Sequence, residues 1–458
     1  MKPLVTFVLP FCFAATLAGC ACREKLYHAS PSQLPHTTRS MKTAGFWIGR
    51  HPCPDETIFS AEQIADLNAH IRSELKLTKD IAGFPASVPG EELRTSLEDQ
   101  LARLRERPLL MGNGRKAAEQ FYGPLQRNMN LRSISCDVDV RYGLVLRFAD
   151  QRLLPTARSL YAIAGDIDFD ELQNSALDLG TAVAVLHESA GGKWYYVQSD
   201  LSAGWVEADH VVLCSLEQLR DYLTRRDSSF VVATRAKTDV FLDESLTEFH
   251  EYIRMGVALP LGPRESSDVV GVVIPFRNDD GSFTAKDAYV RSCDVHRGFR
   301  PYTPRVVIEQ AFELLDTPYG WGGQYGEQDC SRFLQEVFAT VGMALPRNSG
   351  DQCQVGTLLA DFAQAAAPQE KLGLLKARGV GGITILKFRN PSHVAMFLGM
   401  VDGRPYIVHS AWGYRQRLGF SEVVRVINRT SVAELHLGEG STKGSLLDRL
   451  ASVRILSR

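Results

Sequence analysis

The sequence predicts a multidomain chain with a helical N-terminal segment, two small β-barrels and a C-terminal α+β domain. Three patterns predict this organisation. Apolar residues recur at helical spacing up to about residue 138, short strands with glycine turns follow up to about residue 298, and the last third holds a cysteine at a helix start and two histidines in apolar strands. The length of 458 residues is enough for about three domains.

The composition is that of an ordinary globular protein, with 45% apolar and 23% charged residues. The net charge is −2, and acidic and basic residues are interspersed along the chain. Nucleic acid is not expected as a partner, because its recognition needs a basic face.

The first residues are predicted to be a targeting segment. Lys2 is followed by an apolar run over residues 4–18, which is too short to span a membrane as a helix. The run ends in Leu-Ala-Gly-Cys at residues 17–20, which resembles a bacterial lipobox. The resemblance implies a lipoprotein signal peptide over residues 1–19 and acylation of Cys20, with an ordinary signal peptide as the alternative.

These features predict an exported protein that is anchored to a membrane through lipid. Ala21 resembles the pattern for outer-membrane sorting, so an anchor that faces the periplasm is expected if the cell is Gram-negative. Residues 20–43 are polar and contain Pro31 and Pro35, which predicts a tether.

The nine cysteines fit an exported protein but leave their pairing open. Cys12 leaves with the signal peptide and Cys20 is acylated, so seven remain and at least one stays free. Close Cys/His pairs do not repeat in the sequence, so no metal is expected.

Residues 44–138 are predicted to be helical. Ser60 and Gln63 form a capping-box pattern before one amphipathic helix. A second helix is expected over residues 90–106, where leucines form one stripe. Leucines at this spacing indicate a core, so the segment is expected to have a structural role.

Residues 139–215 predict a first small β-barrel. Strands are expected at residues 183–186, 194–197 and 204–206. Gly-x-Trp-Tyr-x-Val followed by Gly-Trp-Val resembles bacterial SH3 domains. Residues 216–298 repeat the β character and resemble a second, more divergent SH3-type barrel.

The C-terminal domain, residues 299–458, contains the candidate catalytic residues. A glycine-rich stretch leads to Asp329 and Cys330, and a helical pattern follows at once, so Cys330 is expected at the first turn of a helix and Asp329 at its cap. The positive end of the helix dipole is expected to lower the pKa of the Cys330 thiol. His393 and His409, in later strands, are a base and an orienting group for thiol catalysis. Packed core residues of the same types are the alternative.

This order of motifs, with Leu345-Pro346-Arg347 between the cysteine and the histidines, resembles the NlpC-type cysteine peptidases. Members of that family are papain-like enzymes that cut the peptide stems of bacterial cell walls. The resemblance covers roughly the last third of the chain. It implies that Cys330 is the nucleophile, His393 the general base and His409 the orienting group.

The same resemblance assigns residues to the substrate. Tyr319, in Tyr319-Gly320-Trp321-Gly322-Gly323, would border the oxyanion region. The implied substrate contacts are Trp321, Asp329 and Ser331. Two positions depart from the family pattern. Arg332 stands where glycine is usual, and Gly381-Gly382-Ile383 replaces the usual Gly-Asp. Arg332 is expected to crowd or charge the cleft and so to affect substrate preference.

The helical segment, two SH3-like barrels and a papain-like α+β domain together resemble peptide-recycling members of the family, in which the helical segment is a clamp and the first barrel narrows the cleft. A narrowed cleft would admit a free peptide terminus only. Asp329 is the candidate partner of the free amine. Asp178, Glu188 and Tyr196 of the first barrel are further guesses that no motif supports.

Within the domain, a helix is expected at residues 305–315 and a C-terminal helix at residues 446–455. Strands are expected at residues 383–388, 393–399 and 406–410, the last two joined by a turn. Antiparallel pairing would then place the two histidines side by side.

The predicted function is hydrolysis of the bond between γ-D-glutamate and a diamino acid, diaminopimelate or lysine, in peptidoglycan stem peptides. The reaction would pass through a Cys330 thioester and need no cofactor. The alternatives are a wall-binding lipoprotein with an inactive catalytic domain, a papain-like amidase or acyltransferase, and a transglutaminase-like enzyme.

Overall fold

The computed structural model describes residues 27–457, which form three seven-stranded sheets and the helices packed on them. The predicted signal peptide, residues 1–19, and the predicted acylation site, Cys20, lie outside the described residues. Among residues 27–457, no helix is both long and apolar enough to cross a membrane.

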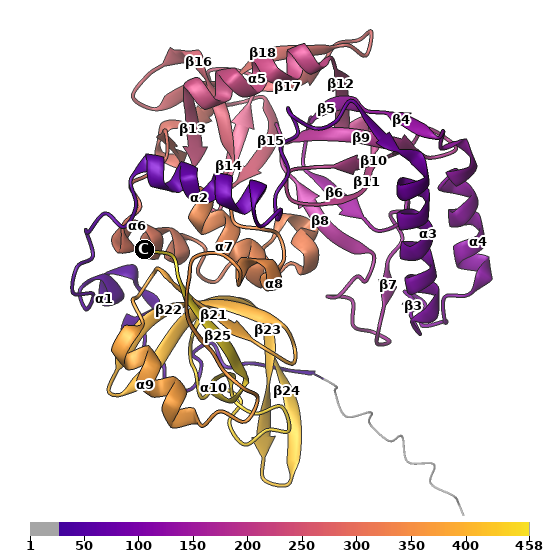
Figure 1. The fold of residues 1–458 in the computed structure, drawn as a ribbon. Helices are drawn as coiled ribbons and strands as arrows, with labels where there is room; N and C mark the ends of the chain where they lie inside the picture. The colour runs from indigo at the N-terminus through magenta and orange to yellow at the C-terminus, as the bar shows by residue number, and fades with distance from the viewer. Residues whose placement is uncertain (1–26, 458) are drawn as a thin grey trace, which may run out of the picture.

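The C-terminal domain is built on a sheet with the strand order β1-β24-β23-β22-β21-β25-β20. Figure 1 shows helices α6, α7 and α8 between this yellow sheet and the rest of the molecule. The strands are β1 (Tyr27–Ala29), β20 (Thr357–Asp361), β21 (Thr384–Phe388), β22 (His393–Val401), β23 (Arg404–Leu418), β24 (Ser421–Glu434) and β25 (Leu450–Ile455). The helices are α6 (Pro304–Glu313), the 3-10 segment η5 (Trp321–Gly326), α7 (Cys330–Ala339), α8 (Ser349–Gln352), α9 (Pro368–Arg378) and α10 (Leu446–Arg449).

Alternate residues of β22 bury both faces of this sheet. Val394 and Met396 pack in the core that contains α6 and α7. Ala395 and Phe397 pack on the opposite face, with α9 and α10. The three predicted strands are confirmed, and Asp402, with a φ of 51°, and its glycine neighbour turn the chain between β22 and β23.

The predicted C-terminal helix over residues 446–455 is wrong in its second half. Helix α10 ends at Arg449, and Leu450–Ile455 forms β25, which pairs with both β21 and β20. Leu450 and Val453 are fully buried in the sheet. The strand is favoured because its backbone groups fill the gap between two other strands, which a helix would leave unpaired.

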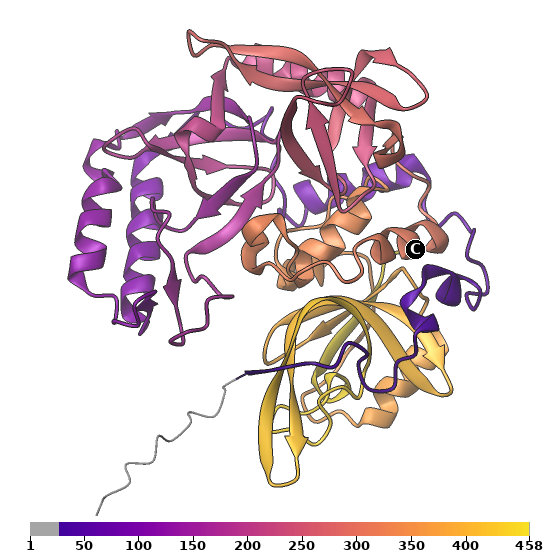
Figure 2. The ribbon, with the colours of Figure 1, turned by 180° about the vertical axis from the view of Figure 1, so that it is seen from behind.

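The predicted tether is wrong for residues 27–43. β1 pairs in parallel with β24, with Tyr27 opposite Val424. Leu34 and Met41 are 3% and 5% exposed, so their apolar side chains hold the segment on the domain. Figure 2 shows this indigo segment running along the yellow sheet.

The N-terminal helices divide between two cores. The helices are α1 (Ala44–Ile48), α2 (Ala61–Ser73), α3 (Gly90–Glu106) and α4 (Glu119–Asn128). The capping box of Ser60 and Gln63 is confirmed at the start of α2. α2 buries Ile64 and Ile71 in the core of the C-terminal domain, whereas the leucine stripe of α3 packs on the first barrel. The clamp role of this segment stays a prediction.

The first barrel has the strand order β12-β5-β9-β10-β11-β6-β8. The strands are β5 (Arg141–Val145), β6 (Ala149–Arg152), β8 (Gln173–Leu177), β9 (Ala182–Glu188), β10 (Trp194–Gln198), β11 (Ala203–Glu207) and β12 (Val211–Cys214). Two short pairs join it to the helices: β2 (Ser87–Pro89) with β4 (Asp137–Asp139), and β3 (Leu110–Met111) with β7 (Leu160–Tyr161).

The third sheet follows helix α5 (Leu216–Ser228), which the sequence analysis did not predict. Its strands are β13 (Phe230–Ala233), β14 (Lys237–Phe241), β15 (Phe249–Arg254), β16 (Ala258–Glu265), β17 (Val269–Arg277), β18 (Phe283–Arg291) and β19 (Val295–Arg297). The predicted β character is therefore confirmed, whereas the assignment to an SH3-type barrel stays a prediction.

Candidate active site

Cys330 is the first residue of α7, and Asp329 caps that helix. The Oδ1 atom of Asp329 accepts a hydrogen bond from the backbone N–H of Arg332 at 2.8 Å. The predicted position of the cysteine at a capped helix start is confirmed.

The glycine turn before Cys330 lies directly against the first barrel. Gly322 and Gly323 have φ values of 64° and 84°, a left-handed conformation that residues with a side chain rarely adopt. A Cβ at Gly322 would lie 2.7 Å from the Cγ atom of Gln173, and one at Gly323 would lie 3.0 Å from the Cβ atom of Ala176. The glycines therefore allow β8 to pack on the segment that leads to the nucleophile.

The two histidines lie side by side on neighbouring antiparallel strands. His393 begins β22, and its Nε2 atom is 2.8 Å from Nδ1 of His409 on β23. Val394, the next residue, directs its backbone N–H to the Cys330 sulfur, so the thiol lies beside the strand that carries His393. With Nε2 of His393 bonded to His409, its Nδ1 atom is the ring nitrogen left for the thiol.

Burial dominates the electrostatics of these groups. Burial, followed by the Asp329 charge, raises the pKa of the Cys330 thiol to about 12, against smaller opposing effects of the Val394 N–H and Arg347. Burial also holds the pKa of His393 well below its usual value and lowers that of His409 to about 3. The expected low thiol pKa is therefore wrong for the resting structure, because burial and the Asp329 charge raise it. Thiol and imidazole are both neutral at rest.

Asp329 and Ser331 are held by an arginine from the Leu345-Pro346-Arg347 motif. Arg347 donates from Nη2 to Oδ2 of Asp329 at 2.7 Å and from Nη1 to the Ser331 hydroxyl at 3.0 Å. Its Nε atom donates to the Ser175 hydroxyl of the first barrel at 3.0 Å. Ser331 in turn donates to Oδ1 of Asp329. Both carboxylate oxygens thus have partners within the chain, and Arg347 balances the Asp329 charge.

Aromatic side chains join the two domains next to this site. Phe169 of the first barrel contacts Trp321 and Trp412, with ring centroids 5.3 and 5.0 Å apart, and lies 6.3 Å from Tyr319. The indole N–H of Trp412 donates to Asp168 at 2.7 Å. Burial, then the Cys330 and Asp329 charges, raises the pKa of Tyr319 well above its usual value.

Arg332 does not charge the substrate side of the site, contrary to the expectation. Its guanidinium donates to Oδ2 of Asp178 at 2.7 Å and to Oε1 of Glu336 at 2.9 Å. Arg254 of the third sheet donates to both oxygens of the same aspartate at 2.8 Å. Asp178, Arg254 and Glu336, which are buried, and the partly buried Arg332 form an ion cluster that joins the first barrel, the third sheet and α7.

The guesses for the first barrel are also corrected. Asp178 is fully used by the buried ion cluster. Glu188 forms an exposed ion pair with Arg141. Tyr196 is 6% exposed and packs against Trp205 in the barrel core.

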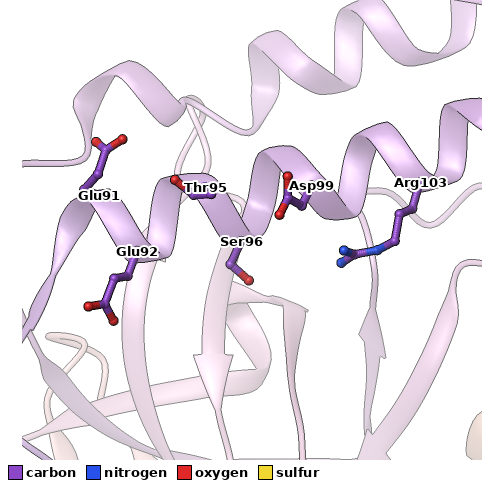
Figure 3. Close-up of a pocket in the computed structure, with 6 residues that line it drawn as sticks. All are labelled: Glu91, Glu92, Thr95, Ser96, Asp99 and Arg103. Atoms are coloured by element: carbon purple, nitrogen blue, oxygen red, sulfur yellow. The ribbon is translucent and has the colours of Figure 1, made fainter.

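Two hollows in the structure lie away from the catalytic groups. A cavity of about 670 Å³ is lined by the face of α7 that carries Arg332 and Glu336, and by residues of both β-domains. Figure 3 shows a depression along the exposed side of α3, lined by Glu91, Glu92, Thr95, Ser96, Asp99 and Arg103. Neither contains Cys330, His393 or His409.

Two charged residues near the site were missed. Asp150 of β6 accepts from Gln173 at 2.8 Å, and Gln173 also donates to the Gly322 carbonyl. Lys387 of β21 influences the pKa of Cys330. A lysine inside an apolar strand was a signal that could have identified Lys387, whereas Asp150 lies in a segment for which no strand was predicted.

Comparisons with known proteins agree with this architecture. Residues 316–423 match the NlpC/P60 family, and residues 160–207 match an SH3 domain of the SH3b1 type. The gamma-D-glutamyl-L-lysine dipeptidyl-peptidase of Bacillus subtilis (strain 168) is 38% identical over 55 residues, which cover 12% of this chain and 19% of that protein. The chain therefore spans less than a fifth of the curated relative that it matches.

Among solved structures, an NlpC/P60 endopeptidase from Photobacterium damselae subsp. piscicida matches with a TM-score of 0.73 and 20% identity, over 89% of this chain and 95% of that chain. An NlpC/P60 family protein from Bacillus cereus ATCC 10987 has a TM-score of 0.44 and 17% identity, over 63% and 83% of the two chains. At this identity the first match shows a shared fold across nearly the whole chain. The chain thus contains an NlpC/P60 domain and an SH3 domain.

Proposed function

We propose that this chain is a cysteine peptidase of peptidoglycan stem peptides, and that it cleaves the bond between γ-D-glutamate and the diamino acid. The observation that carries the proposal is the hydrogen-bonded pair of His393 and His409 beside Cys330, inside the NlpC/P60 domain. The relative from Bacillus subtilis, by its name a gamma-D-glutamyl-L-lysine dipeptidyl-peptidase, supports the choice of bond.

The mechanism begins from the neutral thiol. His393 accepts the thiol proton at Nδ1 while the sulfur of Cys330 attacks the γ-carbonyl carbon. His409 accepts the Nε2–H of His393 and so fixes the tautomer whose Nδ1 lone pair faces the thiol. The backbone N–H of Cys330 and the Tyr319 hydroxyl stabilise the oxyanion. The proton on His393 passes to the leaving amine, and water, deprotonated by the same nitrogen, then hydrolyses the thioester.

The first barrel supports recognition of a free amino terminus. Its strand β8 and Phe169 lie against the segment before Cys330, which supports a substrate-binding site that the barrel narrows at one end. Asp150 retains solvent contact, and desolvation raises the pKa of its carboxyl. Because Asp329 is already paired with Arg347, we assign the amine of the leading L-Ala to Asp150, while Trp321 and Ser331 keep their proposed substrate contacts.

The proposal includes export and a lipid anchor. Leu-Ala-Gly-Cys at residues 17–20 supports acylation of Cys20, with the anchor in the outer membrane if the cell is Gram-negative. Growth with an alkyne-labelled fatty acid is expected to label the chain, and Cys20→Ser is expected to abolish the label. Labelling of the variant would contradict the anchor.

A wall-binding lipoprotein with an inactive catalytic domain is the second candidate. One observation favours it, namely that burial raises the pKa of the Cys330 thiol to about 12. A related papain-like amidase or acyltransferase would use the same three residues on another acyl bond.

The test uses the purified full chain, with Cys330→Ala as control. The substrates are L-Ala-γ-D-Glu-diaminopimelate, its lysine counterpart and their N-acetylated forms, which imitate attachment to glycan. Mass spectrometry is expected to show cleavage of the free peptides and none of the acetylated ones. Cleavage of both would show an open site, and no cleavage by the folded chain would refute the peptidase. Asp150→Asn is expected to raise KM for the free peptides.

A further inference from the structure

A half-buried lysine lies next to the catalytic residues without an acidic partner. Lys387 of β21 donates from Nζ to the Ser349 hydroxyl at 2.8 Å and also to the Ser392 hydroxyl. The two hydroxyl oxygens are 3.0 Å apart. Within residues 27–457, no carboxylate forms an ion pair with this ammonium group; Asp351 acts on it only through space. We refer to Lys387, Ser349 and Ser392 as the donor cluster.

Strand register places the donor cluster near Cys330 and His393. Lys387 lies directly opposite Val394 on β22, so the two side chains share one face of the sheet. Val394 packs against α7, and its N–H reaches the Cys330 sulfur. Ser392 immediately precedes His393 in the chain. Lys387 therefore lies one strand away from the β22 residue that contacts Cys330, and Ser392 is the chain neighbour of His393.

The hydrogen bonds within the donor cluster leave two hydrogen-bond donors unused. Lys387 has three N–H groups, of which the two serines accept two. Each serine has one hydroxyl hydrogen, and the contact between the serines uses one of the two. One ammonium N–H and one hydroxyl thus remain, which matches the two oxygens of a carboxylate. A cationic group would meet repulsion from the Lys387 ammonium group.

Given the proposed peptidase function, we propose that Lys387, Ser349 and Ser392 bind a substrate carboxylate next to the bond that is cut. Two carboxylates flank that bond in a stem peptide: the α-carboxylate of γ-D-glutamate and a carboxylate of the leaving diamino acid. Either would offset the desolvation that lowers the pKa of Lys387 in the free protein. The cluster would thus make the site selective for free acids over carboxamides.

The test compares kcat/KM of the full chain and Lys387→Gln on three peptides. The first carries all its carboxylates, the second has an α-carboxamide on the glutamate, and the third has carboxamides on the leaving residue. Lys387→Gln is expected to lower kcat/KM for the first peptide about 10- to 100-fold, the usual range for a lost charge-assisted hydrogen bond. The same substitution is expected to change kcat/KM little for the peptide in which the bound carboxylate is replaced by a carboxamide. That peptide therefore identifies which of the two carboxylates the cluster binds.

Controls separate this site from other roles of the lysine. Lys376→Gln, an exposed lysine on α9, is expected to leave all three values unchanged, and Lys387→Arg is expected to restore part of the preference for the acid. An equal loss on all three peptides, or no loss on any, would overturn the carboxylate site and leave the peptidase intact.

A second measurement tests the carboxylate site even if the chain cleaves no peptide. Calorimetry measures binding of the first peptide to Cys330→Ala and to Cys330→Ala with Lys387→Gln. Binding that weakens at least about 10-fold in the double variant supports the site independently of catalysis. No binding to Cys330→Ala, or equally tight binding to both variants, would overturn the carboxylate site.

Discussion

The pair of Arg347 and Asp329 is predicted to be a main support of the nucleophile. The arginine is 6% exposed and the aspartate 7%, and two of the four hydrogen bonds of the guanidinium end on Asp329. Burial alone would raise the pKa of Asp329, but the charge and hydrogen bonds of Arg347 outweigh it, and the pKa falls below its usual value. The carboxylate is therefore charged at neutral pH and depends on this one cation.

Arg347→Met removes the cation and leaves a buried charge, which costs about 3–5 kcal/mol of the free energy of unfolding. Asp329→Asn keeps a residue that can cap α7 but leaves Arg347 unpaired, so a similar cost is expected. The double variant contains neither charge and is expected to lose much less than the sum, with a coupling energy of at least about 2 kcal/mol. The exposed pair of Arg141 and Glu188 is the matched control and is expected to show little coupling.

Urea unfolding, followed by circular dichroism and tryptophan fluorescence, measures these three variants, the unchanged chain and the control cycle. Additive losses at Arg347 and Asp329 would refute the reasoning, because they would show that the two charges do not depend on each other. The sign of the pH dependence gives a second check. Since the folded pKa of Asp329 is lowered, its contribution is present above about pH 4 and is lost as the pH falls through the folded pKa.

Three further predictions concern the ion cluster and the histidines. In urea unfolding, Asp178→Asn is expected to lower the free energy of unfolding by about 3–5 kcal/mol, because this aspartate accepts three charged hydrogen bonds. Glu336→Gln is expected to cost clearly less, because one carboxylate oxygen of Glu336 has no hydrogen-bond partner and burial raises its pKa. Equal losses would contradict this ranking. His409→Ala is expected to lower kcat about 10²- to 10⁴-fold and His409→Asn less, because the amide oxygen can still accept the N–H of His393; equal effects with intact circular dichroism would count against an orienting role. The acid limb of kcat/KM is expected below the ordinary histidine value of about 6.5, because burial lowers the pKa of His393 and so keeps the base deprotonated to lower pH; a midpoint at or above that value would contradict the assignment.

Local sequence patterns predicted the parts of the fold that depend on neighbouring residues. The alternation around His393 and His409 was enough to place both on paired strands, and the acid before Cys330 was enough to place the helix cap. The unpredicted helix α5 begins with Ser215 and Gln218, a capping box that the sequence also contains. The helix was not predicted because residues 216–298 were interpreted as one β domain, although the capping box at its start is a local helix signal.

The failures of prediction are those in which distant residues decide. β25 is a strand because β20 and β21 bind both of its edges, which no local pattern contains. Arg332 faces Asp178 of another domain, so its position in the motif could not show where its charge acts. The pKa of Cys330 depends on how much protein covers it, and that quantity exists only after folding.

The contacts of β8 bear on whether the first barrel binds wall or serves the catalytic domain. Gln173 and Ala176 pack on the glycines before Cys330, Ser175 bonds the arginine that holds the cap of α7, and Asp178, at the end of the strand, bonds Arg332 in the first turn of that helix. One short stretch of the barrel thus contacts the segment before the nucleophile, its cap and its helix. The β8 side chains that make these contacts are therefore not free to bind polymeric wall. Because these contacts reach the residues on both sides of Cys330, the barrel belongs to the structural support of the proposed active site, and the same packing supports the proposed preference for a free amino terminus.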